Sequence, residues 1–291
     1  MTRCGTIALA GRPNVGKSSL LNAILGTPLS MVSPKAQATR QAVTGIHSTA
    51  DTQLVFQDLP GLLDPEYLLH RSLRHLALEQ LGKVDVVCQL HPAIEAPAPA
   101  WEALVPDSPP LRRAPVLVYT KGDTIPAARR AELEASGALV VSTSAPPSVD
   151  RLLAHLGTLV PERPFLHDPD DIGTQPVRFF VGEYLREAAF DLLEEELPYS
   201  FTAEVDEFRE DRSPVYIRAT LYVERDSQKG IVIGKGGATL KQIGAHARRR
   251  LETLLGEPVY LETWVKVLPK WRKSRSALTR FGFPVPDDET R

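Results

Sequence analysis

The sequence has few of the features that mark membrane or secreted proteins. None of its apolar runs approaches the roughly 18 uncharged residues that a membrane-spanning helix needs. The short apolar stretch Thr6–Ala10 lacks the length and the flanks of a signal peptide. There are only two cysteines, Cys4 and Cys88, far apart and without metal-ligand spacing, which is typical of reduced structural thiols. We therefore expect a cytosolic protein without disulfides, and the chain shows no internal repeat.

The charge of the chain is unevenly distributed. At 291 residues, with 43% hydrophobic and 24% charged residues, the chain is long enough for two ordinary domains. The net charge is only −2, yet the segment Lys229–Arg280 contains twelve Lys and Arg against three Glu. That segment carries +9 and the rest of the chain −11, so the C-terminal region is suited to bind a polyanion such as nucleic acid.

The first half of the chain alternates short apolar runs with amphipathic stretches, which is the pattern of a doubly wound α/β sheet. Helices are predicted over Lys17–Leu25, which ends at Gly26, and over Trp101–Leu104. Strands are predicted in six segments: Thr6–Ala10, Val43–His47, Gln53–Gln57, Val84–Gln89, Pro115–Tyr119 and Leu139–Ser142.

A segment rich in proline, aspartate and glycine, Pro161–Pro176, has no periodicity and is typical of a linker. We predict a nucleotide-binding domain over residues 1–163, a linker over 164–176 and a second domain with a basic tail over 177–291. The second domain should be a compact α+β unit, with a short helix just before its long one. Its other elements are predicted at Val177–Glu196 (helix), Phe201–Phe208 and Val215–Glu224 (strands), Ala238–Leu255 (helix) and Val259–Val267 (strand).

The segment Gly11–Ser18, GRPNVGKS, matches the phosphate-loop pattern G-x-x-x-x-G-K-[ST] directly between a predicted strand and a predicted helix. Backbone N–H groups of such a loop surround the β-phosphate at a helix N-terminus. Lys17 should bridge the β- and γ-phosphates, and Ser18 should ligate Mg²⁺. The sequence therefore predicts a nucleoside triphosphate site.

Downstream motifs indicate guanine and hydrolysis. Asp58-Leu59-Pro60-Gly61 ends a predicted strand, where the Asp58 carboxylate can hold Mg²⁺ through water and the Gly61 N–H can sense the γ-phosphate. Thr120-Lys121-Gly122-Asp123 follows another strand, and a carboxylate there can accept the paired N1 and N2 donors that adenine lacks. Ser144-Ala145 suits backbone recognition of guanine O6. The predicted nucleotide-binding residues are Gly11, Arg12, Pro13, Asn14, Val15, Gly16, Lys17, Ser18, Ser19, Asp58, Leu59, Pro60, Gly61, Leu62, Thr120, Lys121, Gly122, Asp123, Ser144 and Ala145.

In the second domain, the run Ile231–Gly237, IVIGKGG, contains G-x-x-G before the long predicted helix. This pattern resembles a KH domain of type II, whose G-x-x-G turn clamps the backbone of about four unpaired nucleotides. Ile231 and Ile233 are predicted to pack in the core, as is Trp264 on the last strand, whereas Trp271 in the basic tail is suited either to the core or to base stacking. The predicted RNA-binding residues are Gly234, Lys235, Gly236, Gly237, Lys241, Lys270 and Trp271.

Taken together, GRPNVGKSSLLNAILG, SPKAQATRQAVTGIHS, DLPGL, TKGD, VIGKGG and WVKV resemble the Era family of bacterial ribosome-assembly GTPases over essentially the whole chain. The resemblance implies a phosphate-loop GTPase domain followed by a KH domain, GTP or GDP with Mg²⁺, and the 3′ region of small-subunit ribosomal RNA and the 30S subunit as partners. It also implies a monomer with peripheral association at the cytoplasmic face of the membrane. By this resemblance Thr39 is the switch threonine, so Ser18, Thr39 and Asp58 are the predicted metal ligands.

Two positions depart from the family, which usually has Asn at Thr120 and a second Thr at Ala38. Leu62 stands where Ras-like enzymes carry a water-orienting glutamine, so intrinsic hydrolysis should be slow. In related GTPases an asparagine at the position of Asn14 coordinates K⁺, which can replace an arginine finger; alternatively Asn14 only shapes the loop. The predicted catalytic residues are Asn14, Lys17, Thr39 and Gly61.

Two other functions are compatible with parts of the sequence. A partner GTPase for RNA modification, like the relatives of TrmE, would share the nucleotide motifs but not the G-x-x-G domain. An RNA-binding protein with a purely structural nucleotide site would account for the changes at Thr120 and Ala38. Multiple-turnover GTP hydrolysis distinguishes the last alternative from a GTPase.

Overall fold

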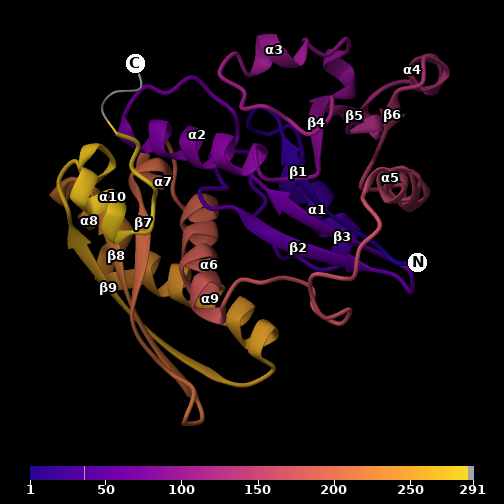
Figure 1. Cartoon of the computed structure of the whole chain (residues 1–291). Helices are drawn as coiled ribbons and strands as arrows, with labels where there is room; N and C mark the ends of the chain where they lie inside the picture. Colours follow the sequence, from indigo (N-terminus) through magenta and orange to yellow (C-terminus); the bar gives the residue numbers. More distant parts are fainter. Residues whose placement is uncertain (36, 288–291) are drawn as a thin grey trace. The chain divides into compact units, whose positions relative to one another are not determined.

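The structure is a computed structural model that describes residues 1–35 and 37–287 (Figure 1). The chain forms two compact units: Met1–Glu66 with His70–Thr174, Pro286 and Asp287, and Tyr67–Leu69 with Gln175–Val285. Among the described residues, no helix is both long and apolar enough to cross a lipid bilayer.

The first unit is built on a six-stranded sheet in the order β2-β3-β1-β4-β5-β6. Strand β2 (Val43–Ser48) runs antiparallel to β3 (Thr52–Asp58), and the other neighbouring pairs are parallel. The remaining strands are β1 (Arg3–Ala10), β4 (Val86–Pro92), β5 (Val116–Thr120) and β6 (Leu139–Val140). All six predicted strands are present, with ends displaced by up to three residues.

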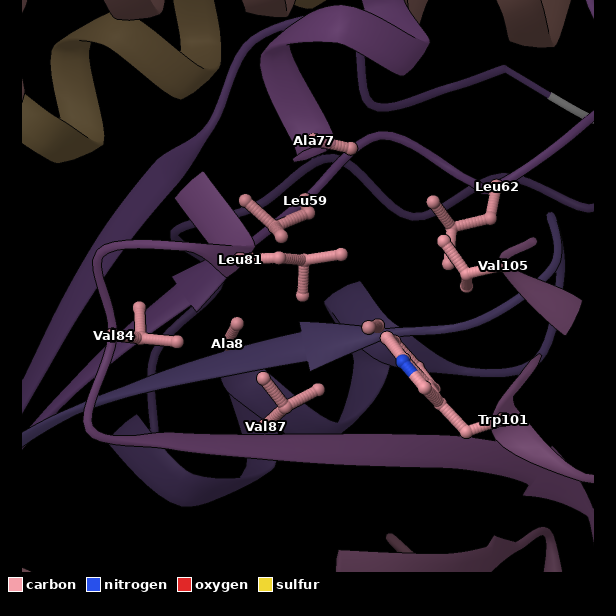
Figure 2. Close-up of a cluster of buried hydrophobic side chains, with 10 residues drawn as sticks. Ala8, Leu59, Leu62, Ala77, Leu81, Val84, Val87, Trp101 and Val105 are labelled. Atoms are coloured by element: carbon pink, nitrogen blue, oxygen red, sulfur yellow. The ribbon is translucent and has the colours of Figure 1, made fainter. Parts of the chain in front are cut away.

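Helices cover this sheet. Helices α1 (Lys17–Leu25) and α5 (Pro146–Leu159) lie against each other and against β3. Helices α2 (Leu68–Leu81) and α3 (Trp101–Leu104) contribute to a buried cluster with residues of β1 and β4, shown in Figure 2. Helix α4 (Ala127–Ala135) lies next to β6. The predicted bounds of α1 and α3 are confirmed, and short 3₁₀ turns η1 (Ala93–Glu95) and η2 (Gly122–Thr124) follow β4 and β5.

Much of the segment predicted as a linker lies along the first unit. The Gln53 side chain, fully buried on β3, accepts hydrogen bonds from the N–H groups of Leu166 and His167 at 2.9 and 3.1 Å and donates to the His167 carbonyl at 2.9 Å. Farther along, Ile46 N donates to the Ile172 carbonyl at 3.0 Å. Residues 164–173 therefore form a strap, in which backbone groups of Leu166, His167 and Ile172 are hydrogen-bonded to β2 and β3.

The second unit contains a three-stranded sheet in the order β7-β8-β9. Strand β8 (Val215–Val223) is antiparallel to β7 (Thr202–Arg209) and parallel to β9 (Val259–Val267). Its long helices α6 (Val177–Leu192) and α9 (Ala238–Leu255) pack together, and α8 (Asp226–Ile233) precedes the turn η3 (Lys235–Gly237). The predicted α+β unit is confirmed, with α9 and β9 at their predicted bounds. The shorter elements are α7 (Leu197–Ser200), η4 (Trp271–Lys273) and α10 (Arg275–Arg280).

Helix α6 ends four residues before the predicted end at Glu196, because a new helical turn, α7, starts at Leu197 with Pro198 in its first turn. Pro198 has no backbone N–H with which to continue α6, and its ring would clash with the carbonyl of the preceding turn, so an unbroken helix through residue 198 is disfavoured. Residues 193–196 therefore form a break between two helices.

Candidate functional site

The phosphate loop lies between the end of β1 at Ala10 and the start of α1 at Lys17. Lys17 is only 6% exposed, and its Nζ donates to the carbonyls of Gly11 at 3.4 Å and Arg12 at 2.9 Å. Burial lowers the pKa of the Lys17 ammonium to about 8, against the opposing effect of the Asp58 charge. A bound phosphate would supply the counter-charge that the buried ammonium lacks.

The three predicted magnesium ligands converge beside this lysine. Ser18 Oγ donates to Asp58 Oδ2 at 2.6 Å, and Thr39 Oγ1 lies 3.0 Å from Ser18 Oγ and 3.5 Å from Asp58 Oδ2. Burial raises the pKa of the Asp58 carboxyl, against the charge of Lys17 and the hydroxyl of Ser18. Asp58 Oδ1 is buried without a hydrogen-bond partner among the described residues. Two hydroxyls and a buried carboxylate short of donors fit Mg²⁺, which prefers oxygen ligands.

A cavity of about 220 Å³ opens between the phosphate loop and the segment that leads to Thr39. All four predicted catalytic residues line it, namely Asn14, Lys17, Thr39 and Gly61. A Cβ on Gly61 would lie 2.8 Å from the backbone nitrogen of Pro13, closer than real contacts allow. Position 61 therefore needs glycine to bring its backbone against the phosphate loop.

The residue after Gly61 belongs to the hydrophobic core. Leu62 is 4% exposed and packs in the cluster that contains Trp101 and Val105 (Figure 2). Its N–H donates to the Gly11 carbonyl at 2.9 Å. Leu59 is buried in the same cluster. The side chains of Leu59 and Leu62 thus belong to the hydrophobic core. Neither of these apolar side chains can orient a water molecule.

The residues predicted to recognise the base are tied to the phosphate loop. Thr120 Oγ1 donates to the Val15 carbonyl at 2.5 Å, and Lys121 Nζ donates to the Asn14 carbonyl at 2.8 Å. Gly122 N donates to Val141 O at 2.9 Å, which fixes the turn after β5 against the segment after β6. The threonine at position 120 thus keeps a hydroxyl donor where the Era family usually has an amide.

A further residue beside Asp123 was not predicted. Ser142 Oγ donates to Asp123 Oδ1 at 2.5 Å and lies 2.8 Å from Ser144 Oγ. Ser142 was assigned to the end of a predicted strand, but β6 ends two residues earlier, at Val140. The sequence signal for its role is its place just after the last strand of the sheet, at the edge where the other predicted site residues also stand.

Asn14 contacts the segment that precedes the switch threonine, because its Nδ2 donates to the Pro34 carbonyl at 2.8 Å. Ala38, the second departure from the family, is 8% exposed and offers no hydroxyl.

In the second unit, the predicted G-x-x-G turn joins α8 to α9. Gly234 has φ +72° and a Cβ there would lie 2.8 Å from Thr239 N, whereas Gly236 has φ +59° with nothing within 4 Å of such a Cβ. The turn therefore requires glycine for its conformation and presents open backbone at Gly236. Lys235 is exposed between them, and Lys241 is exposed on α9.

Three large apolar side chains of the second unit, Trp264, Trp271 and Ile231, do not all lie where the sequence predicted them. Trp271 is fully buried and its Nε1 donates to the Ser200 carbonyl at 2.8 Å, so of its two predicted roles the core is the one observed, and its inclusion among the RNA-binding residues is wrong. Trp264 is 57% exposed and Ile231 is 55% exposed, so the prediction that these two pack in the core is also wrong. Lys270, the lysine of the basic C-terminal tail that was predicted to contact RNA, is exposed.

Comparisons with known proteins match both units. Residues 6–120 match the family model described as 50S ribosome-binding GTPase, and residues 196–272 match the KH domain model. Two solved structures each share 34% identity with the chain over 98% of its length and 100% of theirs, with a TM-score of 0.91. One is a variant of Era from Aquifex aeolicus bound to GDP and AlF₄⁻, and the other is Era in complex with MgGDPNP and nucleotides 1506–1542 of 16S ribosomal RNA. The chain therefore belongs to the Era family, and it is a GTPase with an RNA-binding KH domain.

Proposed function

We propose that this GTPase acts in small ribosomal subunit assembly by binding the 3′ region of small-subunit ribosomal RNA in a manner controlled by GTP. The observation that carries the proposal is the presence in one chain of the Ser18–Thr39–Asp58 cluster and the open G-x-x-G turn. The Era structure with MgGDPNP and nucleotides 1506–1542 of 16S ribosomal RNA supports this choice of target.

The roles in the nucleotide site follow from its geometry. Ser18, Thr39 and Asp58 would hold Mg²⁺, which neutralises phosphate charge when bound. Lys17 would contact the β- and γ-phosphates, and Gly61, pressed against the phosphate loop, would present its N–H to the γ-phosphate. Thr39 Oγ1 lies near both Ser18 Oγ and Asp58 Oδ2, so loss of the γ-phosphate and of Mg²⁺ would release the segment around Thr39.

The base site would use Asp123 to accept the N1 and N2 donors of guanine. Lys121, held by the Asn14 carbonyl, would lie along the base. The backbone of Ser144 and Ala145 would contact O6. This arrangement selects guanine because adenine has no donor pair that matches a carboxylate.

In the RNA site, Gly236 would admit a phosphate close to the backbone, and Lys235 would add a charge contact. Lys241 and Lys270 would extend the basic surface. Ile231, exposed in the last turn of α8, would add an apolar contact for an unpaired base.

The test is the affinity for a short single-stranded RNA copied from the 3′ end of small-subunit ribosomal RNA. It is measured with a GTP analogue, with GDP, and with Gly236→Asp protein. Tight binding with the analogue, weaker binding with GDP and loss in the variant are expected. Gly256→Asp is the matched control, since Gly256 also has φ > 0 and open surroundings but ends α9 away from the turn. Binding that is equal in all nucleotide states would refute GTP control.

The proposed place of action is the cytosol, where the chain would be a monomer that meets the 30S subunit and associates peripherally with the cytoplasmic face of the membrane. Sedimentation with 30S subunits and, separately, with vesicles of anionic lipid tests the two associations. Vesicle binding that is absent at physiological salt would remove the membrane from the proposal without affecting the ribosomal one.

A further inference from the structure

The sheet of the second unit has one covered face and one that is partly open. Helices α6 and α9 pack against β7 and β9 on the covered face (Figure 1). Because side chains alternate along a strand, the opposite face carries Tyr216 of β8 beside Tyr260 of β9, and Thr220 beside Trp264. Tyr260 and Trp264 are 56% and 57% exposed. We call Tyr216, Tyr260 and Trp264 the aromatic platform.

The other end of this open face is covered by the C-terminal helix α10 and the residue after it. The Phe281 ring packs on Tyr222 with ring centroids 5.3 Å apart, and the Arg280 guanidinium lies 5.1 Å from the centroid of the Tyr222 ring. Tyr222 is therefore buried. Tyr260 and Trp264 have no such cover in the described part of the chain, and their rings remain exposed to solvent.

The rings of the aromatic platform are held by one carboxylate and by each other. Glu262 accepts a hydrogen bond from the Tyr216 hydroxyl at 2.6 Å and another from Trp264 Nε1 at 2.8 Å, one on each carboxylate oxygen. The Tyr216 and Tyr260 rings are stacked, with an interplanar angle of 12° and centroids 5.8 Å apart. Side chains that are held in this way lose less conformational entropy when they bind a ligand. The platform is thus prepared for contact with a flat ring such as a nucleobase.

Two cations flank the aromatic platform without a carboxylate partner. The guanidinium of Arg212 lies 5.5 Å from the centroid of the Tyr216 ring, and Lys266 is exposed two residues after Trp264 on the same face of β9. Neither Arg212 nor Lys266 forms an ion pair with any described residue. The nearby carboxylates of β7 and β9 are already engaged: Glu204 by Arg280, Asp206 by Thr220, Glu207 by Arg209 and Arg218, and Glu262 by the platform. Arg212 and Lys266 are therefore available to phosphates at the two ends of the platform.

The strand that carries Tyr260 and Trp264 also packs against the helices of the G-x-x-G turn. Strand β9 contacts α8 and α9, which the turn joins, and it is an edge strand of the sheet. A G-x-x-G turn clamps about four unpaired nucleotides, so a longer unpaired strand extends beyond it. An RNA strand that leaves the turn across the edge of β9 reaches the face with the aromatic platform.

We propose that the aromatic platform is a second contact for single-stranded RNA on this unit, separate from the G-x-x-G turn. Trp264 and Tyr260 stack on unpaired bases, and Arg212 and Lys266 contact the adjacent phosphates. Stacking on aromatic rings combined with contacts from cations holds single strands without reading their sequence. The proposal builds on the proposed RNA site at the turn, since the two contacts hold one strand.

The test measures the affinity of the full-length protein, with a GTP analogue and Mg²⁺, for RNAs of two lengths. One has roughly 12 nucleotides from the 3′ end of small-subunit ribosomal RNA, and the other is the tightest-binding window of about four nucleotides within it. The longer RNA should bind at least ~10-fold more tightly, since each stacked base adds to the affinity. It should also quench the fluorescence of Trp264, whereas Trp101 and Trp271 are buried. The short RNA should leave the fluorescence unchanged.

Two variants of Trp264 assign the effect. Trp264→Ala should weaken binding of the longer RNA roughly 10-fold and leave binding of the short RNA unchanged, which shows that the variant is folded. Trp264→Phe should keep the affinity for the longer RNA within about 3-fold, because phenylalanine also stacks on a base, and should abolish the quenching. Leu192→Ala, which shortens an exposed apolar side chain at the end of α6, is the control and should bind both RNAs as the wild type does.

Unchanged affinity for the longer RNA in Trp264→Ala would overturn the proposal and leave this face as a surface for a protein partner. Equal losses for both RNAs in Trp264→Ala would also overturn it, because the effect would then belong to the fold of the unit. Gly236→Asp separates the platform from the turn. Normal binding of the short RNA in Gly236→Asp would refute the site at the turn, whereas quenching of Trp264 by the longer RNA would still support the platform.

Discussion

The hydroxyl of Thr120 donates to the carbonyl of Val15 at 2.5 Å, and this bond joins the end of β5 to the phosphate loop. Thr120 is 3% exposed, so no bulk water replaces the bond when it is lost. An asparagine is usual in the family at this position. A threonine keeps the donor that fastens the two parts of the nucleotide site, although it lacks the second N–H of an amide.

Removing this hydroxyl should weaken nucleotide binding. Thr120→Val preserves shape but leaves the Val15 carbonyl without its donor, which costs about 1–3 kcal/mol for a buried acceptor. The Kd for GDP, measured by titration calorimetry, should therefore rise roughly 5-fold or more. Thr158→Val, at an exposed position of α5, is the control and should bind GDP normally. An unaltered Kd in Thr120→Val would show that the bond does not stabilise the site.

Hydrolysis should depend on potassium. Leu62 is buried in the core, so a water-orienting side chain is missing at that position, and Asn14 lines the cavity beside Lys17. We expect turnover to be at least ~10-fold faster in KCl than in NaCl at equal ionic strength, and we expect Asn14→Ala to abolish the difference. Equal turnover in both salts would leave Asn14 with a role in loop shape alone, consistent with its bond to Pro34.

The strap over residues 164–173 should stabilise the first unit. Gln53→Leu retains the volume but leaves the N–H groups of Leu166 and His167 without their acceptor. These hydrogen bonds are only partly buried, and one such bond contributes about 0.5–1.5 kcal/mol, so the free energy of unfolding in urea should fall by roughly 1–3 kcal/mol. Gln80→Leu, at a half-buried position of helix α2, tests the same chemical change elsewhere. Equal losses of unfolding free energy in Gln53→Leu and Gln80→Leu would contradict a stabilising role of the strap.

Acid should destabilise the first unit through Asp85. Burial would raise the pKa of this carboxyl, but the backbone N–H of Thr6 at 2.9 Å and the charge of Arg163 at 2.7 Å outweigh it and hold the pKa below its usual value. A folded-state pKa that is depressed stabilises the protein above the unfolded-state pKa, and this contribution is lost as the pH falls through the folded-state value.

Asp85→Asn should therefore lower the free energy of unfolding by roughly 1–3 kcal/mol at pH 7. The difference from wild type should shrink below about pH 4, where the unfolded wild-type chain takes up a proton at Asp85, and should vanish once the pH is below the depressed folded-state pKa. Urea unfolding of both proteins at pH 7, 5 and 3 measures this difference in the free energy of unfolding. A difference that is constant over this range would contradict the assignment to the charged form.

Trp271 should matter for stability and not for base stacking. Its indole is fully buried, lies edge-on to Phe281 with ring centroids 5.4 Å apart, and bonds to the Ser200 carbonyl. Trp271→Ala should cost about 3–5 kcal/mol of stability. Trp271→Phe should lose less stability and should bind RNA as the wild type does. Reduced RNA affinity in a Trp271→Phe protein of wild-type stability would restore the stacking interpretation.

The local motifs were predictable from the sequence because their chemistry depends on spacing along the chain. A strand, a glycine-bounded loop and a helix place Lys17 and Ser18 at one helix N-terminus whatever surrounds them. The bounds of α9 and β9 were likewise marked by glycines and by alternation of apolar residues. The same local logic placed Asp58 at the end of one strand and Asp123 in the turn after another.

The tertiary structure determines which face of each element is buried and which residues that element contacts. The period of two along β9 requires that Trp264 and Val265 point to opposite faces, but only the packing of α9 determines that Val265 is buried and Trp264 is exposed. Trp271, in a tail that carries basic residues, is buried because it packs edge-on against Phe281 and bonds to Ser200, a residue distant in sequence. The contacts of Gln53 with the strap and of Ser142 with Asp123 also join residues far apart in the chain, and such pairings depend on sheet order, which the pattern of a single sequence does not encode locally.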